Sequence, residues 1–182
     1  MAARADTSGE KYLRRGGTAM KIGILSDTHD HLPNIAKAVE LFMKIDVDAV
    51  IHAGDFCSPF TLAEFKPLAG KGLKMYAVFG NNDGDRALLV RRGGEFCSFQ
   101  DGSRIVTLDG RTFAVMHYPD LADDIFKSGA YDVVVYGHDH KLRVEGDNRK
   151  LLNPGTCAGY LADAATVAVV ETSDLKVDVH RL

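Results

Sequence analysis

The sequence of 182 residues has no tryptophan, few prolines and only three cysteines. Cys57, Cys97 and Cys157 are odd in number and widely spaced, which excludes a dense disulfide framework and favours reduced thiols. No apolar run approaches the roughly 18 to 20 residues that a membrane-spanning helix needs, because Gly, Asp or Lys interrupts each one. We therefore expect a cytoplasmic protein that has no membrane partner.

The sequence also lacks an excess of charge of either sign. Its formal net charge is −3, so it has no strong basic field for a nucleic-acid backbone, and nucleic acid is not expected as an obligatory partner. The apolar fraction of 46% is enough for one substantial core. Residues 20–182 are predicted to form a single domain, whereas residues 1–19 are small, charged and glycine-rich and are predicted to be a disordered extension. Met20 is an alternative start.

Short apolar runs alternate with stretches of helical spacing in the first half of the sequence. Strands are predicted over 21–25, 49–52 and 74–79, and helices over 33–45, 59–68 and 85–92. A strand followed by a helix indicates a crossover, so these strands are expected to run parallel. Ligands of such sheets bind beyond the carboxyl ends of the strands.

The second half changes character at Asp109-Gly110, a dipeptide typical of β-hairpins, which lies between predicted strands over 104–107 and 111–116. A helix is predicted over 121–127. Further strands are predicted over 131–136, 141–145, 150–152, 166–171 and 176–180. This order of elements favours an α/β fold in which two sheets are sandwiched between helices.

Metal-binding residue types follow most of these strands. They are Asp27, His29, Asp55, Asn81, His117, His138 and His140. Carboxylate, amide and imidazole groups suit Mn, Fe, Zn or Ni. Asp27 and His29 are two residues apart, so on an extended segment they point to the same side. Each residue alone is typical of a helix cap or an ordinary polar group, but their joint occurrence indicates two divalent metal ions and hydrolysis of a phosphate ester.

The phrases that carry these residues resemble the calcineurin-like metallophosphoesterase superfamily: Asp27-Thr28-His29, Gly54-Asp55, Gly80-Asn81-Asn82-Asp83, His117 and Gly137-His138-Asp139-His140. Within this superfamily the chain is most similar to the small YfcE-type phosphodiesterases. The similarity lies in its compact size, the run from Lys21 to His29 and the phrase Asn153-Pro154-Gly155-Thr156. The resemblance implies a four-layer αββα sandwich of two mixed β-sheets flanked by helices. It also implies a pair of metal ions, with Mn expected and Ni, Fe or Zn as alternatives, a small phosphodiester substrate, and a homo-oligomer (dimer or tetramer).

The resemblance further implies a role for each matching residue. Asp27, His29 and His140 would hold one ion, Asn81, His117 and His138 the other, and Asp55 would bridge them, so that a hydroxide shared by the ions attacks phosphorus. Asp27, Asp55 and Asn82 are the predicted catalytic residues, and Asn82 and Tyr118 the predicted substrate-binding residues.

Two positions depart from the family pattern. Many members have His at the position of Asn82, so the source of the leaving-group proton stays open, although Asn82 is able to hydrogen-bond a phosphoryl oxygen. Relatives commonly read His-Gly-His where this chain reads His117-Tyr118-Pro119. Tyr118 is interpreted either as a ring that stacks on a base or aryl group or as ordinary surface.

Two other functions remain as alternatives at this point. One is a phosphomonoesterase or nucleotide pyrophosphatase that uses the same site. The other is a non-catalytic binding scaffold resembling the retromer subunit, whose metal site is degraded. The complete ligand set of this chain argues against the scaffold.

Overall fold

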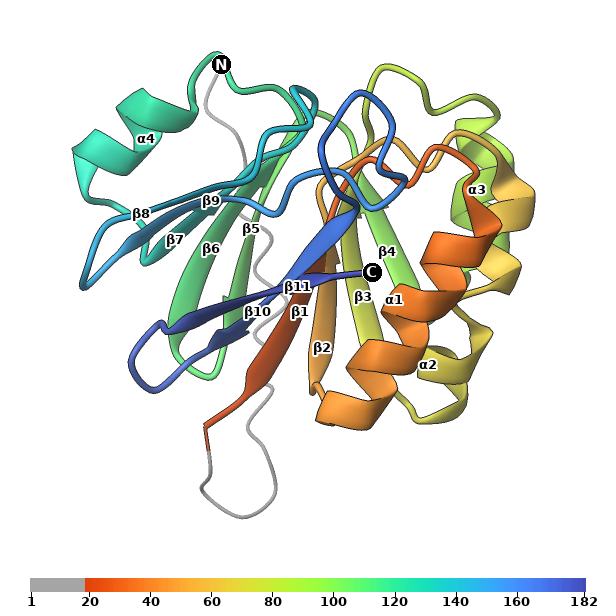
Figure 1. Cartoon of the computed structure of the whole chain (residues 1–182), viewed down its shortest axis with the longest axis horizontal. Coiled ribbons are helices and arrows are strands. Elements are labelled where there is room, and N and C mark those ends of the chain that lie inside the picture. The colour runs from red at the N-terminus through yellow and green to blue at the C-terminus, as the bar shows by residue number, and fades with distance from the viewer. Residues whose placement is uncertain (1–18) are drawn as a thin grey trace.

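The computed structural model describes residues 19–182, so the predicted disordered extension lies outside the described residues except for residue 19. Two mixed β-sheets pack face to face, and helices cover their outer faces (Figure 1). The predicted αββα sandwich is therefore confirmed. Within the described part of the chain, no helix combines the length and apolar character needed to span a membrane, and Cys57, Cys97 and Cys157 are free thiols.

The first sheet has the strand order β11-β10-β1-β2-β3-β4. Its parallel strands are β1 (Lys21–Leu25), β2 (Ala49–His52), β3 (Lys74–Val78) and β4 (Cys97–Gln100). The strand β10 (Thr166–Glu171) pairs antiparallel with both β1 and β11 (Val177–Arg181). The predicted parallel pairing of the first three strands is confirmed, and these strands end at the same edge of the sheet.

The second sheet has the strand order β5-β6-β7-β9-β8. These strands are β5 (Ser103–Leu108), β6 (Arg111–Met116), β7 (Val133–Val135), β8 (Arg143–Glu145) and β9 (Lys150–Asn153). Asp109 and Gly110 join β5 to β6 with φ angles of 50° and 76°, as a tight hairpin turn requires, so the predicted hairpin is confirmed. The strands β6, β7 and β9 run parallel and also end at one edge.

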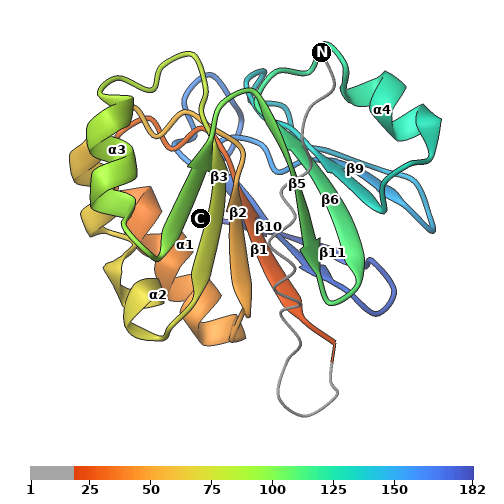
Figure 2. The same cartoon turned by 180° about the vertical axis from the view of Figure 1, so that it is seen from behind.

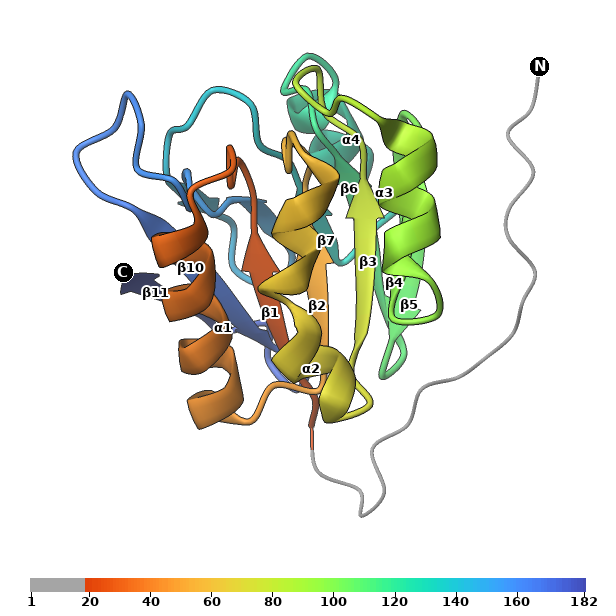
Figure 3. The same ribbon diagram turned by 90° about the vertical axis from the view of Figure 1, so that its right-hand side faces the viewer.

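Helices form the two outer layers (Figures 2 and 3). The first sheet carries α1 (Leu32–Ile45), the short 3-10 helix η1 (Pro59–Ala63), α2 (Lys66–Gly70) and α3 (Arg86–Gly93), whereas α4 (Ala122–Ser128) covers the second sheet. Alternation along β1 separates two cores. Ile22 and Ile24 face the second sheet, while Gly23 lies beneath the Phe42 ring of α1.

Gly23 allows α1 to pack directly on β1. A Cβ at this position would come within 3.0 Å of the Phe42 ring, closer than side chains normally approach. The side chains of Ile35 and Phe42 are fully buried against this sheet. Burial of such apolar side chains stabilises the fold by roughly 1.5–3 kcal/mol each. The close packing fixes α1, and with it the loop that leads from β1 into the helix.

Three predicted elements differ from the structure. The single helix predicted over 59–68 is wrong, because η1 and α2 are separate. Pro67 lies in the first turn of α2, where it has no N–H to continue a preceding helix. The edge strand β4 was missed because it is short and only partly buried. The strand predicted over 141–145 begins at Arg143.

Asp132 connects β6 to the start of β7. Its carboxylate accepts hydrogen bonds from the Thr112 backbone N–H (2.8 Å), the Thr112 hydroxyl (2.7 Å) and the Arg111 guanidinium (3.2 Å). Burial opposes ionisation of Asp132, but the Thr112 and Arg111 contacts outweigh it and hold the pKa of this carboxyl below its ordinary value. The stability that these contacts contribute is present above the ordinary Asp pKa and is lost as the pH falls through the lowered pKa.

Replacing the ionised carboxylate by an amide tests this connection. We expect Asp132→Asn to lower the free energy of unfolding at pH 7 by about 1–2 kcal/mol, since one side-chain oxygen is lost as an acceptor. The difference from the parent protein should shrink below about pH 4, where the parent carboxyl also becomes protonated. Urea titrations at a series of pH values measure both effects. A difference that is the same at every pH would contradict this account.

Candidate metal centre

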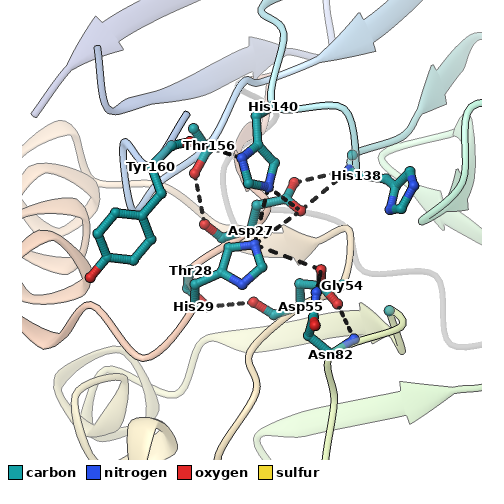
Figure 4. Close-up of polar contacts among 12 residues, drawn as sticks. Asp27, Thr28, His29, Gly54, Asp55, Asn82, His138, His140, Thr156 and Tyr160 are labelled. Atoms are coloured by element: carbon teal, nitrogen blue, oxygen red, sulfur yellow. Dashed lines mark hydrogen bonds and ion pairs between the residues drawn. The ribbon is translucent and has the colours of Figure 1, made fainter. Parts of the chain in front are cut away.

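The loops that follow five strands bring all the predicted ligand residues to one edge of the two sheets. Asp27 and His29 follow β1, Asp55 follows β2, Asn81 follows β3, His117 follows β6, and His138 and His140 follow β7. Most of these side chains are buried or half-buried. Figure 4 shows the centre of this cluster, with His29 and His140 facing each other beside Asp27. The site therefore depends on the strand ends of both sheets.

Asp27, His29 and His140 form the first group of potential ligands. The Nε2 atoms of the two imidazoles are 3.1 Å apart. The Asp27 Oδ1 atom is 3.4 Å from Nε2 of His140 and 3.7 Å from Nε2 of His29. One ligand atom from each residue lies within 4.8 Å of the others, so a single cation could contact all three.

A second group surrounds Asn81 and Asp55. The Asn81 Oδ1 atom is 3.0 Å from His117 Nε2 and 3.0 Å from His138 Nδ1. The Asp55 Oδ2 atom is 3.4 Å from His117 Nε2 and 3.7 Å from His29 Nε2. Asp55 thus lies between the two groups, in the position that the resemblance implied for a bridging carboxylate.

The proton positions of two imidazoles show that these residues fit a metal. His117 Nδ1 lies 2.8 Å from the Ala53 carbonyl and His140 Nδ1 lies 2.9 Å from the Tyr160 carbonyl, so both Nδ1–H groups donate to backbone oxygens. Their Nε2 atoms then face the carboxylates of Asp55 and Asp27. Acceptors that face acceptors repel each other unless a proton or cation lies between them, and this mixed N/O donor set suits a divalent transition metal.

The ligand loops turn more sharply than the sequence predicts. We expected Asp27 and His29 to share a side of an extended segment, but this is wrong: their φ angles are 54° and 40°. Asp55, His138 and His140 also have left-handed φ angles, of 61°, 74° and 60°. Asp and His adopt this conformation more readily than most residues, yet each instance costs on the order of 1–3 kcal/mol. The side chains converge through tight turns rather than through strand alternation.

Asp83 holds the loop after β2 against the loop after β3. Its Oδ1 atom accepts from the backbone N–H groups of Phe56 (2.7 Å) and Cys57 (2.9 Å). Its Oδ2 atom accepts from those of Gly80 (2.7 Å) and Asp55 (3.2 Å). Asp83 therefore orients the backbone of both loops, which explains how the strained turn at Asp55 is maintained.

His52 supports the same turn from below. Its Nδ1 atom accepts from the Gly54 N–H (3.2 Å), so its Nε2–H donates to the Thr28 hydroxyl (3.1 Å), which in turn donates to the Asp55 carbonyl (3.2 Å). The ring stacks on Phe56 at 3.5 Å. Burial lowers the pKa of His52 well below its ordinary value, so the ring stays neutral. His52 therefore has a structural role.

Two further residues near the cluster are also structural. The ring of His31 caps α1, because its Nδ1 atom accepts from the Asn34 N–H at 3.2 Å. Asn153 donates to the Gly137 carbonyl (3.3 Å) and to Asp139 (2.7 Å), and it accepts from the Gly155 N–H (2.9 Å). Asn153 thus forms a turn beside His138 and His140.

Asn82 contacts Asp55 with both its backbone and its side chain. The Asn82 N–H donates to Asp55 Oδ1 and its amide donates to Oδ2, each at 2.8 Å. Burial opposes ionisation of Asp55, but the hydrogen bonds from His117 and Asn82 outweigh it and hold the pKa of Asp55 well below its usual range. A side chain at Gly80 would clash with the same carboxylate. The structure thus uses Asn82 to orient and ionise Asp55.

Tyr118 lies at the rim of the cluster. Its ring centroid is 4.9 Å from that of His138 and 5.1 Å from that of His117, and 47% of the residue is exposed. The ring is available to a substrate on the His138 side of the site.

Sequence reasoning missed three groups that orient the imidazoles. They are the carbonyls of Ala53 and Tyr160 and the Cys57 thiol, whose Sγ atom is 3.4 Å from His29 Nδ1. Burial and the nearby carboxylates, Asp30 foremost, raise the pKa of Cys57 to about 12, so it is a neutral thiol. A backbone carbonyl is present at every residue and gives no signal in a sequence. For Cys57, the one signal in the sequence is its position two residues after Asp55, which places it near the ligand residues.

Known proteins resemble this chain in sequence and in fold. The profile of the calcineurin-like phosphoesterase superfamily domain matches residues 20–175. A phosphodiesterase of Methanocaldococcus jannaschii is 42% identical over 158 residues, which span 84% of this chain and 93% of that protein. The solved structure of an archaeal phosphodiesterase is 40% identical, with a TM-score of 0.81, over 90% of this chain and 100% of the other.

A more distant structure, the phosphoesterase YfcE of E. coli, is 18% identical and has a TM-score of 0.63 over 90% of this chain and 98% of the other. At that identity the likeness extends to the fold alone. The profile match, by contrast, includes every residue of the cluster described above. This chain belongs to the calcineurin-like phosphoesterase superfamily and is a hydrolase of phosphate esters.

Proposed function

We propose that this protein is a phosphodiesterase that hydrolyses a small phosphodiester with two divalent metal ions. The observation that carries the proposal is the convergence of imidazole nitrogens on Asp27 and Asp55 in two adjoining groups. The M. jannaschii relative, itself named a phosphodiesterase, supports the same substrate class. The complete donor set disfavours a non-catalytic scaffold.

In this proposal each ion has its own ligands. Asp27, His29 and His140 would hold one ion, Asn81, His117 and His138 would hold the other, and Asp55 lies between the two groups, where it could serve both. When bound, the two ions supply an activated water and neutralise charge on the phosphoryl oxygens. A set of carboxylate, amide and imidazole donors suits Mn, Fe, Zn or Ni, and the resemblance to the family favours Mn among them.

Residues of the chain then orient the ligands and the substrate. The carbonyls of Ala53 and Tyr160 fix the rings of His117 and His140, and Asp55 stays ionised. Asn82 uses one amide hydrogen for Asp55, which leaves the second for a phosphoryl oxygen. Tyr118 packs against an aromatic group of the substrate. An amide cannot donate a proton to a leaving alcohol, so we expect substrates whose leaving groups are stable anions to react fastest.

Other features of the proposal concern the whole chain. Residues 20–182 act as one catalytic domain. A dimer or tetramer, a cytoplasmic location and the independence from nucleic acid stay predictions from the sequence.

Turnover of matched diester and monoester substrates tests the proposed function. We expect Mn-dependent hydrolysis of bis(p-nitrophenyl) phosphate to exceed that of p-nitrophenyl phosphate. The Asp55→Asn variant should lose at least about 100-fold in kcat/KM, because it removes a carboxylate shared by the two ligand groups. Asp124→Asn, which changes an exposed carboxylate on α4, is the matched control and should keep full activity. Faster monoester turnover would instead support a phosphatase, and no turnover of either would support a binding role.

Removing one oxygen from Asp83 tests how the ligand loops are held. Asp83→Asn presents one acceptor oxygen to four backbone N–H donors, so at least two buried donors lose their partner. We expect a loss of about 2–4 kcal/mol in the free energy of unfolding and weaker Mn binding, measured by denaturant titration and by calorimetry. Asp124→Asn again serves as the control. Mn affinity equal to that of the parent protein would show that Asp83 does not hold the ligand loops.

A further inference from the structure

The loop over residues 157–165, between β9 and β10, brings Tyr160 beside His140 of the candidate metal centre (Figure 4). Its first residues are held firmly. Cys157 N–H donates to the Ser26 carbonyl (2.9 Å), Ala158 N–H donates to the Asp27 carbonyl (3.1 Å), and the Tyr160 carbonyl accepts from His140. The far end is held where Leu182 N–H donates to the Ala165 carbonyl (3.0 Å). The tip between these anchors therefore has a defined place next to His140.

Leu161 at this tip is unusual in two ways. Its φ angle is +57°, a conformation that a leucine adopts only at a cost, and 97% of the residue is exposed to solvent. Tyr160 before it is half-exposed, with its ring edge-on to His31. A strained backbone that presents an apolar side chain to water beside a catalytic centre is not explained by folding stability. It is explained if the side chain contacts a ligand.

A surface hollow of about 400 Å³ lies on the His140 side of this tip. It is bounded by His140, Lys141, Leu142, Leu161, Asp163 and Arg181. Leu142 is 49% exposed, so two apolar side chains face solvent here. The volume is within the range of sites that hold small molecules. Because His140 forms one wall, the hollow lies next to the ion that Asp27, His29 and His140 are predicted to hold.

The charges of the hollow favour an anion. Across residues 19–182, the side chains of Lys141 and Arg181 make neither an ion pair nor a hydrogen bond with another residue. Asp163 contributes a negative charge to the same wall, so the three charged residues leave one net positive charge. Two cations without partners lie next to exposed leucines. They match a ligand that has an apolar body and, besides the phosphate that is hydrolysed, a second negative group.

We propose that this hollow binds the part of the diester that stays on the phosphate, and that it prefers a group bearing a second phosphate. Lys141 and Arg181 contact the second phosphate, and Leu142 and Leu161 contact the apolar body of the group. The inference rests on the proposed phosphodiesterase function and specifies its substrate class.

Two chromogenic diesters that differ by one phosphate test the proposal. They are thymidine 5′-(p-nitrophenyl phosphate) and its 3′-phosphorylated form, both with p-nitrophenol as the leaving group. In the Mn-loaded protein we expect the 3′-phosphate to lower KM by roughly 5-fold or more and to leave kcat nearly unchanged. Equal KM values for the two substrates would overturn the proposal.

Variants then assign the effect to the hollow. Lys141→Met with Arg181→Met should remove the preference for the 3′-phosphate, so that the two substrates have equal KM values. Lys44→Met with Arg91→Met, on α1 and α3, changes the net charge equally and should keep the preference. Leu161→Gly relieves the strained backbone, so the variant should fold, and it should raise KM for both substrates several-fold. A preference that survives in the first double variant would place the phosphate elsewhere and overturn the proposal.

Binding without turnover separates this proposal from the proposed function. Calorimetry compares thymidine 3′,5′-bisphosphate with thymidine 5′-phosphate on the Mn-loaded protein and on the two double variants. Suppose that neither diester is hydrolysed, but that the bisphosphate binds at least about 5-fold tighter than thymidine 5′-phosphate and that only Lys141→Met with Arg181→Met removes this difference. The phosphodiesterase proposal then fails, while the proposed phosphate-binding role of the hollow is supported. Equal affinities of the two nucleotides would overturn the proposed phosphate-binding role of the hollow, whether or not the diesters are hydrolysed.

Discussion

The mutual repulsion of the ligand atoms is the constraint on which the rest of this structure depends. His29 and His140 bring ring nitrogens to 3.1 Å, and the carboxylates of Asp27 and Asp55 lie beside nitrogens whose protons are on the other side of the ring. Nitrogen and oxygen atoms this close need a proton or a cation between them. The protein must therefore hold these atoms together with energy from elsewhere, and the loops that carry them must be unable to relax.

That energy comes from backbone contacts around the cluster rather than from the ligands. Asp83 binds four N–H groups of two loops, and His52 and Thr28 hold the turn at Asp55 from the core side. Two glycines permit the close approach: a side chain at Gly54 would come within 2.6 Å of the His117 ring, and one at Gly137 would clash with Ser26. The interior apolar layers keep the strand ends in register, so the left-handed turns are imposed on the loops.

Local patterns and the family resemblance were sufficient to predict the layers and to predict which polar residues meet at the strand ends. Runs of β-branched residues marked most strands, and Asp109-Gly110 marked the hairpin. Parallel strands end at one edge, which brought the residues after β1, β2 and β3 together without any knowledge of distances. The prediction of one helix over 59–68 was wrong because it followed the apolar spacing, although Pro67 lies in the first turn of a separate helix there.

The remaining errors arose where the backbone, not the side chain, determines the geometry. Asp27 and His29 were expected on an extended segment because their spacing of two fits a strand, yet both adopt left-handed turns that no composition signals. The carbonyl partners of His117 and His140 lie far away in the sequence and belong to Ala53 and Tyr160, residues with no chemical signature of the role. Such partners follow only from the packing of the two sheets.

The two sides of the cluster bear on the choice between diester and monoester. On one side, the Tyr118 ring lies against His138 and is half-exposed. On the other, the loop that carries Tyr160 and Leu161 is hydrogen-bonded to His140. A phosphodiester has two organic groups that leave the phosphorus in different directions, and each side offers apolar surface for one of them. A monoester would occupy one side and leave the other, including the strained Leu161, without a contact. The shape of the site therefore favours a diester independently of the relatives.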